Sequence, residues 1–249
     1  MKVGIFITAR MGSTRLPEKH LLKINGREIM GYLVSRIIHE FSSEIKSNEV
    51  LVVIVTGNRN TNFKFETSFK ESLVFYGDDD NIPKRHLEAA EFYGIDLIVS
   101  VDGDDILCSP NAMRKVYKTL KEGYVFVKTE GLPLGLNAWG YSTSFLKESL
   151  KKNNYSKLET GWGRIFNQTN LKTINFNIKN DDFLRFTLDY KADLDFFTEI
   201  IKQSDIDILT IKDDQLIDLV INKNIYKKNM SIAKEYWENF KMNIKKEEI

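Results

Sequence analysis

The sequence predicts a single α/β domain built on a mixed, mostly parallel sheet between two layers of helices. Two observations predict this class. Short runs rich in β-branched and apolar residues recur through the first half of the chain, and each is followed by a segment with helical spacing of its apolar residues. Strands that alternate with helices favour parallel pairing, because each helix crosses back over the sheet and the next strand then runs in the same direction as the last. No Pro- or Gly-rich linker interrupts residues 1–249, so one domain is expected.

The first half, residues 1–123, contains the clearest strands and helices. Apolar runs with little alternation are typical of strands that are buried on both faces. Such runs predict strands over 3–8, 49–56, 73–77 and 96–101. Helical spacing, together with Pro near the start and Gly at the end of some segments, predicts helices between them. These helices are expected over 26–41, 83–94 and 111–123.

The second half has a less regular order. Strands are expected over 124–128, 171–178 and 184–189, and helices over 142–152 and 191–203. Ser156 and Glu159 have the spacing of a capping box, which predicts a further helix over 156–168. Residues 206–249 are expected to form two C-terminal helices.

Composition excludes several classes of protein. Lys and Arg number 36 and Asp and Glu number 35, so the formal charge is +1, which argues against a nucleic-acid surface or an acidic-membrane anchor. The single cysteine, Cys108, cannot form an internal disulfide or a cysteine-based zinc site, and we expect it to be buried. The N-terminus resembles neither a signal peptide nor a membrane span, so a cytoplasmic protein is expected.

Three charged segments follow predicted strands. The basic segment "TARMGSTRLPEKHLLKING" covers 8–26, "DGDD" covers 102–105 and "LDYKAD" covers 188–193. In a parallel sheet, ligands bind beyond the carboxyl ends of the strands. A cation-rich loop suits a polyphosphate, and clustered carboxylates suit Mg²⁺ or Mn²⁺. Taken singly, each segment could be a solvated loop, an Asp-Gly turn or a helix cap. Together they indicate metal-assisted nucleotide chemistry.

Other chemistries find little support. The sequence has neither a Walker loop nor a Gly-x-Gly-x-x-Gly motif, which disfavours a Rossmann dinucleotide site. His20, His39 and His86 are scattered without the spacing of metal ligands. Trp139 and Trp162 could line a substrate pocket or pack in the core, and the sequence leaves both readings open.

Four stretches along residues 1–205 carry a recognisable set of motifs. "ITARMGSTRLPEKHLLKINGREIM" contains Ala-Arg-x-x-Ser-x-Arg-Leu-Pro-x-Lys, and "YGDDDNIPKRHLEAAEFYGIDLIVSVDGDDILCSP" contains an acidic run, an Arg, an Ala-Ala helix and a Gly-Asp. "GLPLGLNAWGYS" and "RFTLDYKADLDFF" follow. In this order the motifs resemble those of the nucleotide-sugar cytidylyltransferases. The resemblance is closest to the spore-coat polysaccharide type, in a group that includes the 3-deoxy-manno-octulosonate and acylneuraminate enzymes.

The resemblance implies a Rossmann-like fold of the nucleotide-diphospho-sugar transferase (GT-A-like) type and a set of site residues. Residues 1–123 would bind the nucleotide, and 124–205 would bind the acceptor and form a dimer interface. Arg10, Lys19 and Asp104 would be catalytic, and Asp104 and Asp189 would hold Mg²⁺ or Mn²⁺. The nucleotide site would comprise Thr8, Ala9, Arg10, Met11, Gly12, Ser13, Arg15, Lys19, Arg85 and Asp102. Asn137, Trp139 and Asp193 would contact the acceptor.

The implied reaction transfers CMP from CTP to a small anionic acceptor and releases pyrophosphate, for surface polysaccharide or glycoconjugate synthesis. The acceptor stays open among a sugar acid, a sugar phosphate and a related phosphorylated or phosphonate compound. Glu18 stands where this family usually has Gly, and "DGDDIL" replaces its Gly-Asp-x-Pro-Leu. Two alternatives therefore remain: an enzyme of the same fold that uses another nucleotide or a nucleotide sugar, and an inactive nucleotide-binding relative. A homodimer is also expected.

Overall fold

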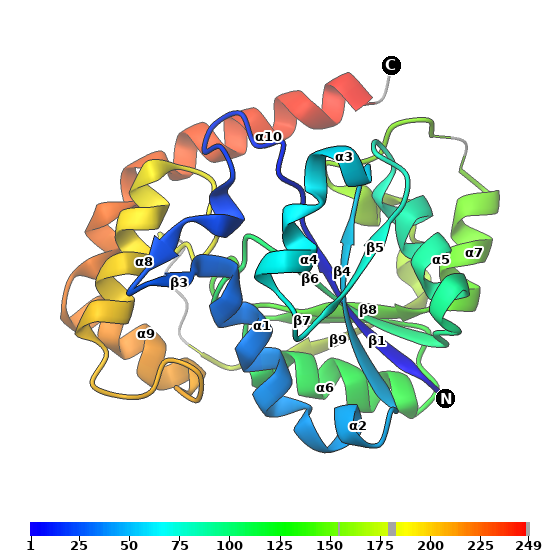
Figure 1. The fold of residues 1–249 in the computed structure, drawn as a ribbon, viewed down its shortest axis with the longest axis horizontal. Coiled ribbons are helices and arrows are strands. Elements are labelled where there is room, and N and C mark those ends of the chain that lie inside the picture. The colour runs from blue at the N-terminus through cyan, green and yellow to red at the C-terminus, as the bar shows by residue number, and fades with distance from the viewer. Residues whose placement is uncertain (154, 179–182, 248–249) are drawn as a thin grey trace.

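The computed structural model describes residues 1–153, 155–178 and 183–247, and it has a seven-stranded sheet in the order β5-β4-β1-β6-β8-β7-β9 (Figure 1). The strands are β1 Val3–Thr8, β4 Val50–Thr56, β5 Leu73–Tyr76, β6 Leu97–Asp102, β7 Phe126–Glu130, β8 Trp139–Ser142 and β9 Leu171–Asn175. Strand β8 pairs antiparallel with β6 and β7, and the other pairs in the sheet are parallel. The mixed, mostly parallel sheet predicted from the sequence is confirmed.

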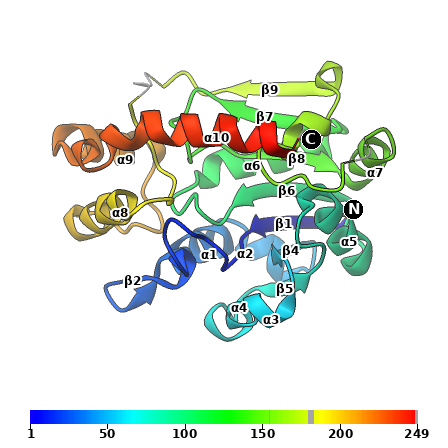
Figure 2. The ribbon, with the colours of Figure 1, turned by 90° about the horizontal axis from the view of Figure 1, so that it is seen from above.

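Helices cover both faces of this sheet (Figures 1 and 2). The longer ones are α1 Ile29–Glu40, α5 Ile82–Tyr93, α6 Pro110–Lys121, α7 Thr143–Lys151, α8 Lys191–Gln203, α9 Asp213–Asn222 and α10 Ala233–Glu247. Side chains of β1 alternate between two separate cores: Ile5 and Ile7 pack with α1, α6, α8 and α9, whereas Phe6 packs with α5 and α7. Two cores on opposite faces of one sheet make the three-layer sandwich that was predicted.

The predicted helix signals have the expected geometry. The Ser109 hydroxyl accepts a hydrogen bond from the Ala112 N–H (3.0 Å) and so caps α6, whose first residue is Pro110. Helix α5 ends at Gly94, whose φ of 64° lies in the left-handed region that glycine adopts without strain. The Ser109 hydroxyl also donates to the Asp213 carboxylate (2.7 Å), which ties the start of α9 to the start of α6.

Two predicted elements are wrong. Residues 156–168 form a loop with the 3₁₀ turns η2 Trp162–Ile165 and η3 Gln168–Asn170. The Leu158 N–H there donates to the Asp80 carbonyl (2.8 Å), so the backbone is engaged outside a helix. Residues 184–189 are not a strand, because they make one isolated bridge, between Leu134 and Arg185, in place of a ladder.

Several short elements were not predicted. They comprise β2 Lys23–Ile24, β3 Arg27–Glu28, η1 Lys19–Leu21, α2 Ser42–Lys46, α3 Arg59–Asn62, α4 Lys64–Ser68, η4 Ile225–Lys228 and η5 Met230–Ile232. Strands β2 and β3 form a hairpin whose turn, Asn25-Gly26, has φ of 52° and 77°. Positive φ at both positions is what a type I′ turn requires. Strand β8 was also missed. Among the described residues, no helix combines the length and apolar character needed to cross a bilayer.

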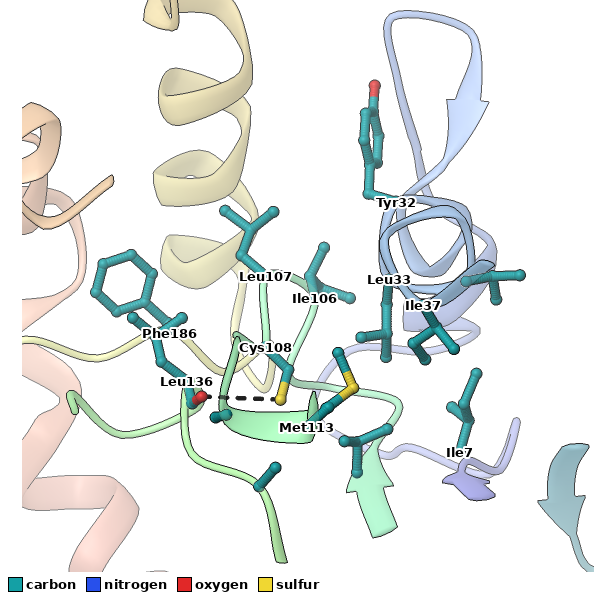
Figure 3. Packing of buried hydrophobic residues seen from close by; sticks show 14 of the residues in the cluster. Ile7, Tyr32, Leu33, Ile37, Ile106, Leu107, Cys108, Met113, Leu136 and Phe186 are labelled. Atoms are coloured by element: carbon teal, nitrogen blue, oxygen red, sulfur yellow. Dashed lines mark hydrogen bonds between the residues drawn. The ribbon is translucent and has the colours of Figure 1, made fainter. Parts of the chain in front are cut away.

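Cys108 lies in the larger core, as predicted. Figure 3 shows it among Ile106, Leu107 and Met113, with its Sγ atom facing the Leu136 carbonyl oxygen at 3.8 Å. The side chain is fully buried, and this burial raises the pKa of the thiol well above its usual value. The thiol therefore stays protonated and packs as a small apolar group.

Glu18 has a strained backbone. Its φ of 49° lies in the left-handed region, immediately before η1. Left-handed geometry costs an L-residue about 1–2 kcal/mol, and glycine escapes this cost. The Glu18 carboxylate pairs with the exposed Lys64 ammonium and does not line the cavity described below. A glycine at this position is therefore favoured by backbone conformation, and the Glu18 charge points away from the site.

We expect Glu18→Gly to be more stable than Glu18→Ala by about 1 kcal/mol, because both variants lose the Lys64 ion pair and only the glycine relieves the left-handed strain. Urea unfolding of the two variants at one pH measures the difference. Equal stability of the two variants would contradict the strained geometry.

His86 is fully buried between the sheet and the loop that contains Trp162. Its ring nitrogens lie 2.7 Å from the Tyr141 hydroxyl and 2.9 Å from the Thr8 hydroxyl. Burial, aided by the Arg85 charge, holds the pKa of His86 well below its usual value. The folded protein therefore keeps this imidazole neutral, whereas the unfolded chain takes up a proton below a pH of about 6.5. The stability that depends on the neutral ring is present above that pH and is lost as the pH falls.

Replacing His86 by Gln should flatten this part of the pH dependence. Below pH 6, wild-type protein should lose about 1.4 kcal/mol of unfolding free energy per pH unit more than His86→Gln. Urea unfolding of both proteins between pH 5 and 8 provides the measurement. Parallel curves for the two proteins over this range would show that His86 is not held neutral.

Candidate active site

The site lies where the order of the parallel strands reverses. Strand β1 lies between β4 and β6, and Thr8 at its end is in register with Val55 on one side and with Asp102 on the other. The loops that leave β1 and β6 therefore start side by side, at the position where open α/β sheets bind ligands. A cavity of about 910 Å³ opens there.

A buried lysine joins the charged segments. The Lys19 ammonium lies 2.5 Å from Asp104 Oδ2 and 3.1 Å from Asp189 Oδ1, and its side chain is 8% exposed. His20 supports the same carboxylate, because its Nε2 lies 2.8 Å from Asp104 Oδ1. Lys19 and His20 both come from η1, which turns the basic segment back toward the end of β6.

The pKa values at this junction follow from burial and pairing. Burial alone acts to lower the pKa of Lys19, but the charges of Asp104 and Asp189 outweigh it and raise that pKa. Burial acts to raise the pKa of Asp104, but Lys19 and the contact with His20 lower it below its usual range. Lysine and carboxylate therefore both stay ionised.

The other two carboxyls of "DGDD" behave in the opposite way. The Asp102 side chain is exposed at the cavity, but the desolvating protein around it and the nearby charge of Asp104 raise its pKa to about 7. Burial and its acidic neighbours raise the pKa of Asp105 well above its usual range. A smaller cavity of about 190 Å³ is lined by Asp105 and shares Asp102 and Asp104 with the large one. Desolvation and mutual repulsion among these carboxyls thus favour the protonated forms of Asp102 and Asp105.

Asp189 reaches the site by a route that the sequence did not predict. It does not follow a strand, since the segment before it hydrogen-bonds to two loops. The Phe186 N–H donates to the Leu134 carbonyl (2.7 Å), and the Leu188 N–H donates to the Asp104 carbonyl (2.9 Å). The second bond places Asp189 directly beside Asp104. The predicted convergence of the three charged segments is present, although only two of them follow strands.

The first loop supplies two further cations. Arg15 lies 2.8 Å from Asp189 Oδ1 and over the Tyr190 ring, and Arg10 pairs with Glu159. The predicted loop residues that line the cavity are Thr8, Ala9, Arg10, Gly12, Ser13, Arg15 and Lys19. Met11 does not line it: the side chain is buried and the Met11 N–H donates to Asn62 Oδ1 (2.9 Å).

Arg85 also lines the cavity, although only 1% of this residue is exposed. Its Nε and Nη1 atoms have no hydrogen-bond partner within the ranges that the structure describes. Burial lowers the pKa of this guanidinium, although the Glu159 charge opposes that shift. A buried guanidinium with free donors beside a cavity suits an anionic ligand.

Of the three residues predicted to contact the acceptor, one lines the cavity and two do not. Trp139 lines the cavity and packs against Trp162 with their ring centroids 4.4 Å apart, so both tryptophans belong to a core and to the cavity wall. Asn137 is not brought to the cavity, because its amide donates to the Leu132 carbonyl (2.8 Å). Asp193 is not brought there either, because it is fully buried and accepts the backbone N–H of Asp189 (2.9 Å).

Sequence reasoning missed several residues of the cavity wall. They are His20, Ile82, Lys128, Glu159, Arg164 and, on α10, Glu235, Asn239, Phe240, Met242, Asn243 and Lys246, with Thr14, Thr160, Gly161 and Gly163. Residues of helix α10 and of the first loop line the same cavity. At its end the Glu247 carboxylate accepts the Thr160 N–H (2.8 Å) and pairs with Arg164 (3.2 Å). Local patterns could not place these residues, because their partners lie far away in the chain.

The donor set fits a cation held by two carboxylates. In the part of the chain that the structure describes, no group of three or more His, Cys, Asp or Glu side chains is arranged to hold a metal ion. Asp104 and Asp189 nevertheless converge on one ammonium. Mg²⁺ is usually held by one or two carboxylates together with substrate phosphates, so this pair has suitable chemistry.

Comparison with solved structures shows the same fold. A cytidylyltransferase from Leptospira borgpetersenii superposes with a TM-score of 0.77 at 25% identity, covering 92% of this chain and 98% of the other. A CMP:2-keto-3-deoxy-manno-octonic acid synthetase solved with CTP superposes with a TM-score of 0.60 at 14% identity, covering 82% and 99%. The second likeness concerns the fold alone.

Sequence comparison identifies the family. An uncharacterized protein of Methanocaldococcus jannaschii is 29% identical over 93% of this chain and 95% of its own length. The 3-deoxy-manno-octulosonate cytidylyltransferase of Coxiella burnetii is 33% identical over 49% of this chain and 47% of its own length, so that match spans about half of the relative. The family model described as cytidylyltransferase matches residues 5–232. This match over most of the chain shows that the protein belongs to the cytidylyltransferase family and is a CTP-dependent nucleotidyltransferase.

Proposed function

We propose that the protein transfers CMP from CTP to a small anionic sugar derivative and releases pyrophosphate. The observation that supports this most directly is the pairing of Lys19 with Asp104 and Asp189 at the floor of the cavity. This arrangement puts a phosphate-binding cation and two metal-binding carboxylates at one point. In-line attack on a nucleotide α-phosphorus needs both kinds of group.

The cations of the first loop would bind the triphosphate. Arg10 and Lys19 are held by Glu159 and by the aspartates, and both line the cavity. Arg85 has donors at the same wall that no described residue accepts. Phosphate oxygens can replace the carboxylates as partners of these cations, which stabilises the negative charge that develops during transfer.

Mg²⁺ or Mn²⁺ would be held by Asp104 and Asp189. When bound, such a cation reduces the negative charge of the phosphates and orients them. The raised pKa values of Asp102 and Asp105 support this proposal, since added positive charge would relieve the repulsion among the neighbouring carboxyls.

In the reaction, a hydroxyl or phosphate oxygen of the acceptor forms a bond to the α-phosphorus. The bond from that phosphorus to the oxygen bridging the α- and β-phosphates breaks, pyrophosphate leaves, and a hydroxyl proton passes to solvent. The relative named as a 3-deoxy-manno-octulosonate cytidylyltransferase supports a sugar acid as the acceptor. Lys128 and Arg164 in the cavity wall would bind its carboxylate, and Trp139 would contact its carbon skeleton. Surface-glycan synthesis is the corresponding role.

Pyrophosphate release with a panel of acceptors tests the proposal. With MgCl₂ and a sugar-acid acceptor, we expect pyrophosphate release from CTP to be at least about 10²-fold faster than release from ATP, GTP or UTP. The reason is that a site built to hydrogen-bond one base leaves its own polar groups unpaired when another base binds. A sugar phosphate and a phosphonate serve as comparison acceptors. Release from no nucleotide with any acceptor would sink the proposal.

Replacing either metal-binding carboxylate should abolish turnover. For Asp104→Asn and Asp189→Asn we expect the rate of pyrophosphate release to fall by about 10²-fold or more, since each loses a charge aimed at the metal and phosphates. The control is Asp218→Asn, on the exposed side of α9, which should keep the wild-type rate. Circular dichroism confirms that each variant is folded. A near-normal rate for either site variant would refute the metal assignment.

A further inference from the structure

A second buried cation lies behind Asp189. The Arg185 side chain is 2% exposed, and its Nη2 lies 2.8 Å from Asp189 Oδ2. The same guanidinium reaches Asp193, with Nε 3.1 Å from Oδ1 and Nη2 3.2 Å from Oδ2. A single fork therefore holds two carboxylates, which lysine, with its compact ammonium group, cannot reproduce.

Asp193 is fixed in place by other groups. Its Oδ2 accepts the backbone N–H groups of Asp189 and Tyr190, each at 2.9 Å, and its Oδ1 accepts the Asn229 amide at 2.9 Å. Asp193 therefore caps the start of α8 and is held by hydrogen bonds from several sides. Held in this way, it fixes the plane of the Arg185 guanidinium.

Helix α10 closes the remaining side of Arg185. The Tyr236 ring lies over the guanidinium, with the Arg185 Cζ atom 4.0 Å from the ring centroid. This contact is a cation–π interaction in a buried setting. Tyr236 lies beyond residue 232, where the match to the family model ends, so the cover over Arg185 comes from a segment outside that match.

The two oxygens of Asp189 consequently have separate partners. Oδ2 faces the buried Arg185, whereas Oδ1 faces the cavity, where it meets Lys19 at 3.1 Å and Arg15 at 2.8 Å. Without Arg185, the carboxylate could rotate and present either oxygen to either side. The guanidinium thus determines which oxygen remains for a ligand in the cavity.

We propose that Arg185 is a positioning residue: it orients the Asp189 carboxylate so that Oδ1 is presented to the divalent cation and the nucleotide. The inference rests on the proposed function. Partners that orient a metal-binding carboxylate typically contribute 10- to 100-fold in metal affinity. Arg185 itself does not line either cavity of the site, so a direct effect on the nucleotide is not expected.

The test is Arg185→Lys, which keeps the positive charge and removes the fork. We expect its affinity for Mn²⁺, measured by electron paramagnetic resonance with an α,β-methylene analogue of CTP bound, to fall about 10- to 100-fold. Its affinity for the analogue without metal should stay close to that of the wild type, because Arg10, Lys19 and Arg85 are unchanged.

Arg36→Lys is the matched control. Arg36 is also fully buried, but its Nη1 atom donates to the backbone carbonyl of Ile208 (2.5 Å) and the residue lines neither cavity of the site. Like Arg185→Lys, it should lower the urea midpoint of unfolding. It should leave Mn²⁺ affinity at the wild-type value, which separates positioning from loss of stability.

The outcomes are distinguishable. Wild-type Mn²⁺ affinity in folded Arg185→Lys would overturn the positioning role, as would an equal loss in Arg36→Lys. If Arg185→Lys does not fold, Asp193→Asn takes its place, because it removes the charged partner that fixes the plane of the guanidinium and keeps the side-chain volume. A loss of Mn²⁺ affinity then supports the positioning role, and wild-type affinity overturns it. Failure of the wild-type protein to bind the analogue or Mn²⁺ would instead contradict the proposed function.

Discussion

The structure of the site depends on one buried ammonium group. Lys19 is 8% exposed on its side chain, and it lies between Asp104 and Asp189. Any of these three charges would be costly to bury alone, so the folded protein must bring them together. The pairing joins the loop after β1, the loop after β6 and the segment before α8. The floor of the cavity is thereby determined by electrostatics as well as by the sheet.

The sheet provides the precision that this pairing needs. Strands β1 and β6 are in register at Thr8 and Asp102, so two of the three loops leave from neighbouring positions. The third arrives through a backbone hydrogen bond from Leu188 to the Asp104 carbonyl (2.9 Å). Rigid strands place the loops that carry Lys19 and Asp104, and a main-chain contact between loops places Asp189 beside them. Irregular backbone is tolerated in such a site only where other loops satisfy the hydrogen bonds of its N–H and C=O groups.

The elements that could be predicted are those whose signal is local. Strands β1, β4 and β6 are apolar runs, and Ser109 marks the start of α6, so their own sequences suffice. Residues 156–168 carried a capping signal, yet the Leu158 backbone pairs with Asp80, and no local pattern contains that partner. The same holds for α10, whose Glu247 binds the loop at Thr160. Contacts between distant segments decide such cases, and a single sequence does not display them.

The contacts around Asp189 divide into exchangeable and fixed pairs. The exchangeable pairs lie at the cavity surface, where carboxylates pair with Lys19, Arg15 and, farther along the wall, Arg10. There an incoming phosphate can take the place of a carboxylate, and an incoming cation can take the place of a basic side chain. Arg185 pairs with Asp193 in the buried interior, where no ligand reaches, and breaking that pair would leave an uncompensated charge. The carboxylate between these two groups can therefore change its outer partners while its inner one holds it still, which is the condition for preorganised binding.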